Sequence, residues 1–202
     1  MAQLIIGLGN KGGEYRHTRH NAGWMVLDEL QRRGKFGRER REGPAKVVEG
    51  SLVGYDVILA KPQTYMNLSG RAATHLTRKF GIPVHDVVVV HDEVDLPLGR
   101  LQLRRGGGTA GNRGVRSLAE SWQTPDFMRL RVGVGRPPAG ADTADHVLDR
   151  FEPDERPIID AEIQRAADGV ILLLREGEER AMNAVNRRRP DPPAPDPAGT
   201  AE

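Results

Sequence analysis

Asn10 and His20 follow the first apolar run of the chain, and both are residue types that can take part in chemistry at the end of a strand. Histidine is the side chain best suited to proton transfer near neutral pH, because its ordinary pKa lies there. For His20 taken alone, one of six histidines, a surface or capping position is the alternative. The two residues define a first candidate site, for a reaction that needs a base.

The stretch that leads into them, LIIGLGNKGG, carries glycines spaced as G-x-G-x-x-G at Gly7, Gly9 and Gly12. A dinucleotide-binding loop with this spacing also needs a helix that begins at the loop, and an acidic residue about 20 residues further on. The loop is followed instead by the polar stretch EYRHTRHN, which has no helical apolar period. We therefore expect no NAD or FAD site, and expect the glycines to shape a turn that presents Asn10 beside His20.

The length and composition of the chain limit the classes of protein to which it can belong. At 202 residues the chain is long enough for one domain with a substantial core. It has no cysteine, which excludes disulfides, thiolate metal sites and thiol nucleophiles. Arginine supplies 25 of the 30 basic residues, often in clusters, which is compatible with phosphate or nucleic-acid binding and equally with a solvated surface. With no membrane-spanning run and no secretion signal in the sequence, we expect a cytosolic protein.

The apolar patterns predict one α/β domain over residues 1–186 with a mixed sheet. Predicted strands cover residues 3–6, 45–52, 56–61, 86–91, 99–104 and 127–134. Predicted helices cover residues 22–33, 114–122, 153–175 and 178–186, with a further one from a cap at Asn67 or Ser69 to Phe80. Residues 34–43 are predicted to form a basic loop. The Pro-, Ala- and Asp-rich tail, 187–202, is predicted to be disordered.

Four blocks of sequence occur in a fixed order along this pattern. They are GLGN followed by YRHTRHNAG (7–23), KPQTYMNLSG (61–70), HDEVDLPLG (91–99) and FMRLRVGVG (127–135). Together they resemble bacterial peptidyl-tRNA hydrolases, with matching order and spacing from about residue 3 to residue 186. The resemblance implies an enzyme that cleaves the ester between a peptide and the terminal ribose of tRNA. It also implies a three-layer fold with a twisted mixed sheet between helices, a monomer, and no cofactor or metal.

The resemblance implies a general-base mechanism at His20. This residue would take a proton from the water that attacks the ester carbonyl, and Asp92 would orient and polarise the imidazole. Asn10 and Asn67 would line the pocket with amides that donate and accept hydrogen bonds without charge. The alternatives are a solvated strand-end acid for Asp92 and a helix cap for Asn67.

The resemblance also implies contacts to the nucleic-acid part of the substrate. Tyr15 and Tyr65 resemble positions that flank the site and contact the tRNA end. Arg104 and Arg131 resemble a basic pair that clamps the 5′-phosphate, where a terminal phosphate carries more charge than an internal one. Solvated positions on sheet strands are the alternative for these two arginines.

Two segments depart from the family pattern. Lys11 stands where the family usually has proline, which replaces a fixed φ by a flexible cation. The glycine-rich block reads GGGTAGNRG (106–114), so Asn112 and Arg113 stand where the family usually has His-Asn. Either Asn112 substitutes for the usual pocket asparagine, or Arg113 directs its guanidinium at the ester or a phosphate, or the site is weakened. An arginine can stabilise an oxyanion, but its bulk can also block a pocket. We favour a working enzyme over a non-catalytic RNA-binding relative.

Overall fold

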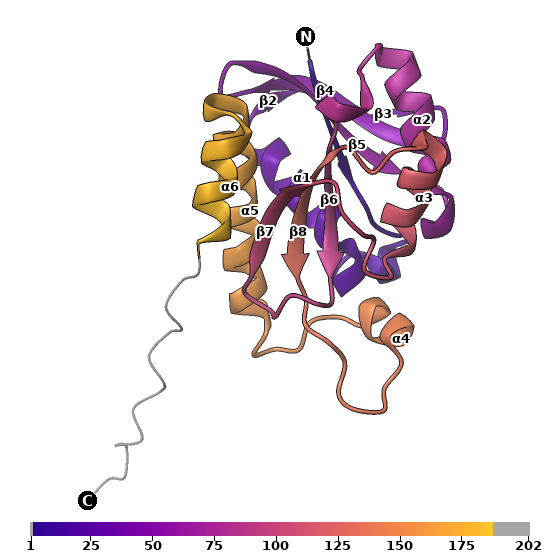
Figure 1. Ribbon diagram of the computed structural model, residues 1–202, viewed down its shortest axis with the longest axis vertical. Coiled ribbons are helices and arrows are strands. Elements are labelled where there is room, and N and C mark those ends of the chain that lie inside the picture. Colours follow the sequence, from indigo (N-terminus) through magenta and orange to yellow (C-terminus); the bar gives the residue numbers. More distant parts are fainter. Residues whose placement is uncertain (1, 188–202) are drawn as a thin grey trace, which may run out of the picture.

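A computed structural model describes residues 2–187 of the chain, so all of the predicted tail except Arg187 lies outside the described residues. Its centre is an eight-stranded mixed sheet with the strand order β2-β4-β5-β1-β6-β8-β7, and β3 pairs with β4 beside this path (Figure 1). The strands are β1 (Gln3–Gly7), β2 (Lys35–Phe36), β3 (Arg40–Glu42), β4 (Ala45–Leu52), β5 (Tyr55–Pro62), β6 (Val88–Glu93), β7 (Leu101–Arg105) and β8 (Met128–Gly133). Strands β5, β1, β6 and β8 run parallel, whereas β4 and β7 are antiparallel to their neighbours.

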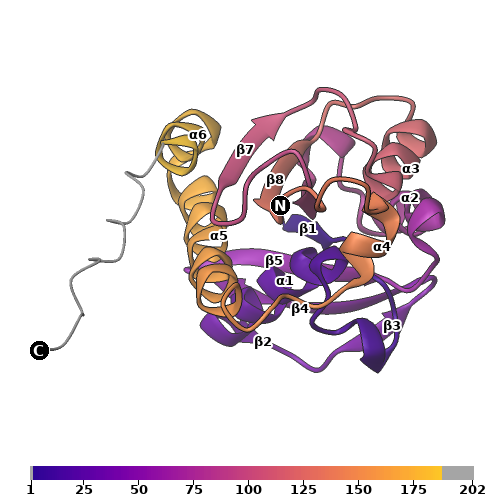
Figure 2. The ribbon, with the colours of Figure 1, turned by 90° about the horizontal axis from the view of Figure 1, so that it is seen from below.

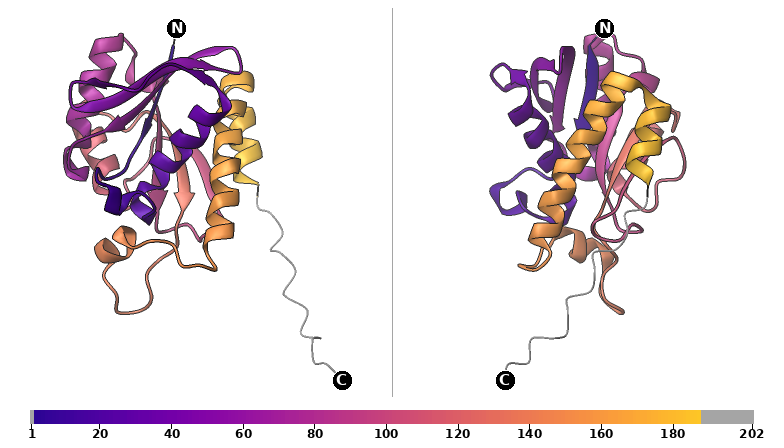
Figure 3. Two further views of the ribbon diagram at one scale, coloured as in Figure 1. Left: turned by 180° about the vertical axis from the view of Figure 1, so that it is seen from behind. Right: turned by 90° about the vertical axis from the view of Figure 1, so that its left-hand side faces the viewer.

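Helices cover both faces of this sheet (Figures 1 and 2). One face carries α1 (Ala22–Arg33), α5 (Arg156–Glu176) and α6 (Glu178–Asn186), and the other carries α2 (Ser69–Phe80) and α3 (Arg113–Trp122). The short helix α4 (Thr143–Leu148) lies beyond the ends of the strands (Figure 3). The predicted three-layer α/β fold is thus confirmed. In the part of the chain that the structure describes, no helix combines the length and the apolar character needed to cross a membrane.

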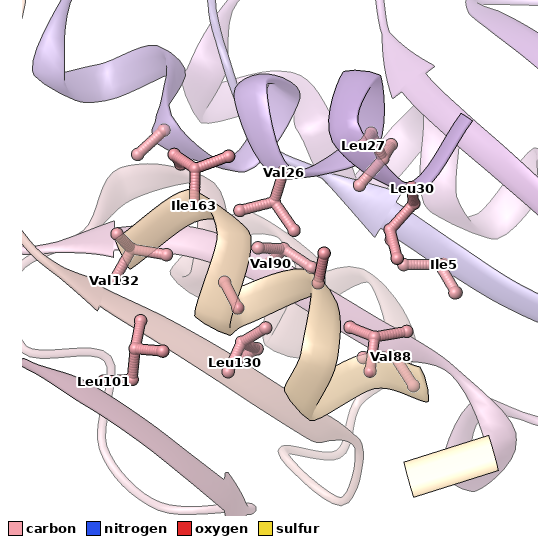
Figure 4. Packing of buried hydrophobic residues seen from close by; sticks show 14 of the residues in the cluster. Ile5, Val26, Leu27, Leu30, Val88, Val90, Leu101, Leu130, Val132 and Ile163 are labelled. Carbon is pink, nitrogen blue, oxygen red and sulfur yellow. The ribbon is translucent and has the colours of Figure 1, made fainter. Parts of the chain in front are cut away.

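The apolar residues of the central strands divide between two cores, one on each face of the sheet. Val88 and Val90 of β6 and Leu130 of β8 point toward α1 and α5 (Figure 4). All six residues of β6 are buried, as its valine run predicts for a strand covered on both faces. Because side chains alternate along a strand, Arg129 and Arg131 of β8 point to the opposite face of the sheet, the face that α2 and α3 cover.

Glycines let α1 lie directly on the sheet. A Cβ atom on Gly23 would come within 2.4 Å of the Val90 carbonyl oxygen and 2.6 Å of the Leu8 carbonyl oxygen. A Cβ on Gly7 would meet the Gly23 carbonyl oxygen at 2.6 Å, and one on Gly9 would meet the Trp24 ring at 2.8 Å. These glycines therefore permit close packing, and the helix that follows them begins only at Ala22.

We expect Gly23→Ala to destabilise the fold and to lower activity. The added methyl group meets backbone oxygens that cannot turn away, so α1 and the turn before it must shift, at a cost of about 1–3 kcal/mol. Thermal unfolding should show a Tm several degrees lower than that of the unsubstituted chain. Gly13→Ala is the matched control, because no atom lies within 4 Å of a Cβ there. Equal Tm values for the two variants would contradict this account of the packing.

Several local expectations were wrong. Residues 34–43 contain the short strands β2 and β3 in place of a loop, because strands of two and three mostly charged residues carry no apolar alternation. The side chains of Asn67 and Ser69 do not cap α2. Asn67 lies in a 3-10 turn (Met66–Leu68), and the Ser69 hydroxyl donates to the Met66 carbonyl oxygen. Helix α4 was not predicted.

Candidate active site

The site lies where the carboxyl ends of parallel strands meet. Strand β1 is flanked by β5 on one side and β6 on the other, while α1 and α2 lie on opposite faces. Such a point, where successive connections leave to opposite faces, leaves a crevice at the strand ends. Asn10 comes after β1 and Asp92 lies near the end of β6, so the topology brings them to this crevice.

A pocket of about 890 Å³ opens there. Most of the predicted site residues line it: Asn10, His20, Tyr65, Asn67, Asp92, Asn112 and Arg113. Its other wall comes from the loop after β8 and from α4, which includes Pro137, Val147 and Leu148. In Figure 2, α4 and the orange loop that leads to it lie across the view of the strands. Among residues 2–187, no group of three or more His, Cys, Asp or Glu side chains is placed to hold a metal ion.

His20 and Asp92 form a hydrogen-bonded pair in this pocket. The His20 Nδ1 atom lies 2.9 Å from Asp92 Oδ2, and the two side chains are 13% and 2% exposed. Burial acts to lower the pKa of His20, but the charge and the hydrogen bond of Asp92 raise it above its ordinary value overall. With Nδ1 directed at Asp92, Nε2 is the nitrogen left to exchange a proton with a molecule in the pocket.

The turn that carries His20 is braced by a distant segment. His20 lies in a 3-10 turn (Arg19–Asn21) just before α1. Next to it, the buried Arg19 side chain donates to the Arg150 carbonyl oxygen at 2.6 Å and pairs with Glu155 at 2.5 Å. The Arg19 N–H also donates to the Asp149 carbonyl oxygen at 3.0 Å. These contacts hold the turn that carries His20 from outside the strand crevice.

Asn112 holds Asp92 in place. Its Nδ2 donates to Asp92 Oδ1 at 3.1 Å, and its Oδ1 accepts from the N–H groups of Gly114 and Val115 at 3.0 and 3.1 Å. Asn112 is therefore the N-cap of α3 as well as a partner of the carboxylate. Burial acts to raise the pKa of Asp92, but the charge and the hydrogen bond of His20 lower it by more. The pKa of Asp92 therefore lies below its ordinary value, and the carboxyl group is ionised.

Asn21, which is not among the predicted site residues, holds the backbone of Asn10 in place. Its Oδ1 accepts from the Asn10 N–H at 2.8 Å, and its Nδ2 donates to the Asn10 carbonyl oxygen at 3.0 Å. Asn21 is almost fully buried. Both hydrogen bonds act on the Asn10 backbone, so the Asn10 amide side chain is left to face the pocket. The sequence feature that could have pointed to Asn21 is its position directly after His20.

A model of the family described as peptidyl-tRNA hydrolase matches residues 4–193. The chain belongs to the peptidyl-tRNA hydrolase family. The peptidyl-tRNA hydrolase of Rhodococcus erythropolis is 48% identical over 185 residues, which cover 91% of this chain and 97% of that protein. The one from Nocardia farcinica is 46% identical over 91% of this chain and 95% of that protein. A crystal structure of the Acinetobacter baumannii peptidyl-tRNA hydrolase matches with a TM-score of 0.86 and 34% identity, over 92% of this chain and 94% of that one.

Arg113 places a positive charge at the pocket. It is the first residue of α3, and its exposed side chain lies on the pocket lining. Its positive charge acts to lower the pKa of His20, against the stronger effect of Asp92. Within residues 2–187, no carboxylate forms an ion pair with Arg113. The guanidinium is thus available to an anionic or carbonyl group in the pocket.

Three predicted contact residues lie outside the pocket lining. Tyr15 ends a 3-10 turn (Gly13–Tyr15), where its carbonyl oxygen accepts from the Thr18 hydroxyl at 2.9 Å. Arg131 pairs with the buried Glu93 at 2.6 Å and is 12% exposed. Arg104 stands opposite Arg129 in the β7–β8 register.

Arg129, which is not among the predicted site residues, anchors the glycine-rich segment. Its guanidinium donates to the carbonyl oxygens of Gly106, Gly107 and Gly108, and its side chain is almost fully buried. Burial first, and then the charges of Arg104 and Arg131, lower the pKa of Arg129 to about 10. Three arginines therefore share one face of β7 and β8, beside the segment that leads to Asn112.

Proposed function

We propose that this member of the family hydrolyses the ester bond between the peptide and the terminal ribose of peptidyl-tRNA, with His20 as the general base. The observation that carries the proposal is the buried pair of His20 Nδ1 and Asp92 Oδ2, 2.9 Å apart in a pocket of about 890 Å³. The membership of the chain in the peptidyl-tRNA hydrolase family supports this substrate.

The proposed reaction begins with a water molecule between His20 Nε2 and the ester carbonyl. As its oxygen attacks the carbonyl carbon, Nε2 accepts one proton and a tetrahedral oxyanion forms. Asp92 stabilises the imidazolium and keeps Nδ1 protonated. When the intermediate collapses, the ester bond breaks and His20 returns the proton to the leaving ribose oxygen. The products are the peptide acid and tRNA with a free terminal hydroxyl group.

Asn10, Asn67 and Arg113 surround this reaction in the proposal. The two amides hydrogen-bond the 3′ end of the substrate and the water. Arg113 stabilises the negative charge that develops on the carbonyl oxygen, since its guanidinium has no carboxylate partner within residues 2–187. Asn112 does not substitute for the usual pocket asparagine, because both ends of its amide are engaged by Asp92 and by α3.

Contacts further from the ester complete the proposal. Tyr65, 73% exposed at the pocket, and Tyr15 contact the tRNA end. Arg104 and Arg131 contact the 5′-phosphate, with Arg131 held in place by Glu93. The enzyme acts as a monomer in the cytoplasm, without cofactor or metal.

The test is hydrolysis of purified peptidyl-tRNA by the wild-type chain and by Arg113→Asn over a range of pH. His20 must be unprotonated to act as a base, and the charge of Arg113 favours that form. Its removal therefore raises the pKa of His20, and the acid limb of kcat/KM should move to higher pH. Arg116→Asn, an exposed arginine further along α3, is the control and should not move the limb.

Two results would contradict the proposal. If the wild-type chain binds tRNA but releases no peptide, the chain is a non-catalytic RNA-binding relative. If Arg113→Asn hydrolyses the ester faster while its acid limb stays in place, Arg113 blocks the pocket and does not assist the reaction.

A further inference from the structure

A second hollow lies beside the active-site pocket, on the side of β3. It has a volume of about 250 Å³ and is lined by Lys11, Glu39, Arg40, Arg41, Lys46 and Gln63. Four of these six side chains are cationic and one is acidic. We call it the basic groove. Figure 2 shows β3 next to the indigo segment that follows β1.

The basic groove lies next to the active-site pocket. Asn10 and Tyr65 line the pocket, and their near neighbours Lys11 and Gln63 line the groove. Lys11 Nζ lies 5.7 Å from the centre of the Tyr65 ring, so a cation and an exposed aromatic ring stand together at the boundary. The groove therefore begins next to Tyr65, at the edge of the pocket.

The cations of the groove are not all balanced within the protein. Arg40 pairs with Glu42 and Glu49, and Lys46 pairs with Glu39 at 2.9 Å. For Lys11 and Arg41, by contrast, no carboxylate of the described residues is an ion-pair partner. The Arg41 Nε atom donates to the Gly43 carbonyl oxygen, which leaves the two terminal nitrogens of its guanidinium for a ligand.

The register of the sheet places like charges side by side. Arg41 of β3 stands opposite Lys46 of β4, and Lys46 stands opposite Lys61 of β5. Residues directly opposite each other project on the same face, and like charges in such pairs destabilise a sheet. Two adjacent pairs of this kind run from the β3 edge toward α1, where Lys61 pairs with Asp28. An anionic ligand would offset this repulsion.

We propose that Lys11 and Arg41 form a binding subsite for the phosphodiester backbone of single-stranded RNA, next to the terminal nucleoside held in the active site. A cationic groove beside an exposed aromatic ring is the usual means of holding single-stranded nucleic acid, because phosphates meet the cations and bases stack on the ring. The inference rests on the proposed function, since it assigns the subsite to the 3′ end of the tRNA substrate.

The test compares ester substrates that differ in their phosphates. The full chain and its Lys11→Gln/Arg41→Gln variant are assayed with a peptidyl ester of adenosine, a peptidyl ester of a short oligoribonucleotide, and peptidyl-tRNA. We expect the ratio of kcat/KM for the oligonucleotide ester to that for the adenosine ester to fall about tenfold in the variant. Each lost phosphate contact should also reduce the slope of log affinity against log salt by about 0.7 for a single strand.

The matched control is Arg38→Gln, an exposed arginine in the same segment that does not line the groove. An equal fall in the ratio for this control would overturn the inference, because the loss of any positive charge in this segment would then have the same effect. An unchanged ratio in the double variant would also overturn it. So would a loss that depends on acidic residues in the peptide and not on the number of nucleotides, since the groove would then hold the peptide.

The same assay distinguishes a failure of the proposed function from a failure of the subsite. If the wild-type chain cleaves none of the three esters, the hydrolase proposal fails. Binding of a non-hydrolysable 3′-oligoribonucleotide then still tests the subsite. Weaker binding in the double variant than in Arg38→Gln supports the subsite, and equal binding overturns it.

Discussion

Replacing His20 with alanine should lower kcat/KM for peptidyl-tRNA by about 10²–10⁴-fold, the range that general-base assistance supplies. The loss should fall mainly on kcat, because His20 acts on the attacking water and contributes little of the contact area with tRNA. The affinity for tRNA should therefore change much less than the rate. The measurement is single-turnover release of peptide, together with filter binding of deacylated tRNA.

The control for this substitution is His85→Ala, an exposed histidine outside the pocket lining. A His20→Ala chain that keeps more than a tenth of the wild-type rate would show that another group takes the proton. An equal loss of tRNA affinity and rate would show that His20 contributes to substrate binding or to the local fold.

Asp92→Asn should cause the second large loss, by roughly 10²–10⁴-fold in kcat/KM. The amide no longer stabilises the imidazolium, and it does not hold Nδ1 in one tautomer. Asp92 is also the group that raises the pKa of His20. Once it is neutral, burial and Arg113 both favour the uncharged imidazole, so the pKa of His20 should fall. NMR titration of the His20 ring measures this shift directly.

Asp160→Asn is the matched control, since this exposed carboxylate on α5 does not line the pocket. A fall in the pKa of His20 would show that Asp92 acts on the imidazole and does not only stabilise the fold. If Asp92→Asn loses activity while the pKa of His20 stays at its wild-type value, the carboxylate does not act through the imidazole. A large drop in Tm with the same loss would point to a structural role.

The residues that form the sheet and its main helices were predictable because their apolar spacing is long and regular. The valine run predicted a strand buried on both faces, and helix 22–33 was predicted with the bounds that α1 has. By contrast, β3 is a short charged strand and α4 has six residues. Neither has enough apolar residues to show a period, and both depend on contacts with distant segments.

The candidate site was predictable in its residue types but not in its contacts. The family resemblance predicted that four residues share one pocket, and all four line the pocket in the structure: His20, Asp92, Asn10 and Asn67. The amide of Asn112 spans the Asp92 carboxylate and the first turn of α3, a contact between residues 20 positions apart that no local pattern encodes. The same holds for the pairing of Arg131 with Glu93.

The opening glycines show why context decides between two interpretations of one motif. Their spacing fits a dinucleotide loop, yet Gly7 and Gly9 lie against Gly23 and Trp24. A Cβ at either position would collide with α1, so the glycines bring the helix, and the His20 turn before it, close to Asn10. The prediction of a turn that serves Asn10 and His20 agrees with these contacts.

The most direct test of the account is the agreement between two pKa values of one group. The kinetic value comes from the acid limb of wild-type kcat/KM with peptidyl-tRNA, and the second comes from NMR titration of the His20 ring in the free enzyme. We predict that the two coincide above the ordinary histidine value, because Asp92 raises the pKa of His20. A hydrolysis rate that does not follow the titration of His20 would contradict its role as the general base.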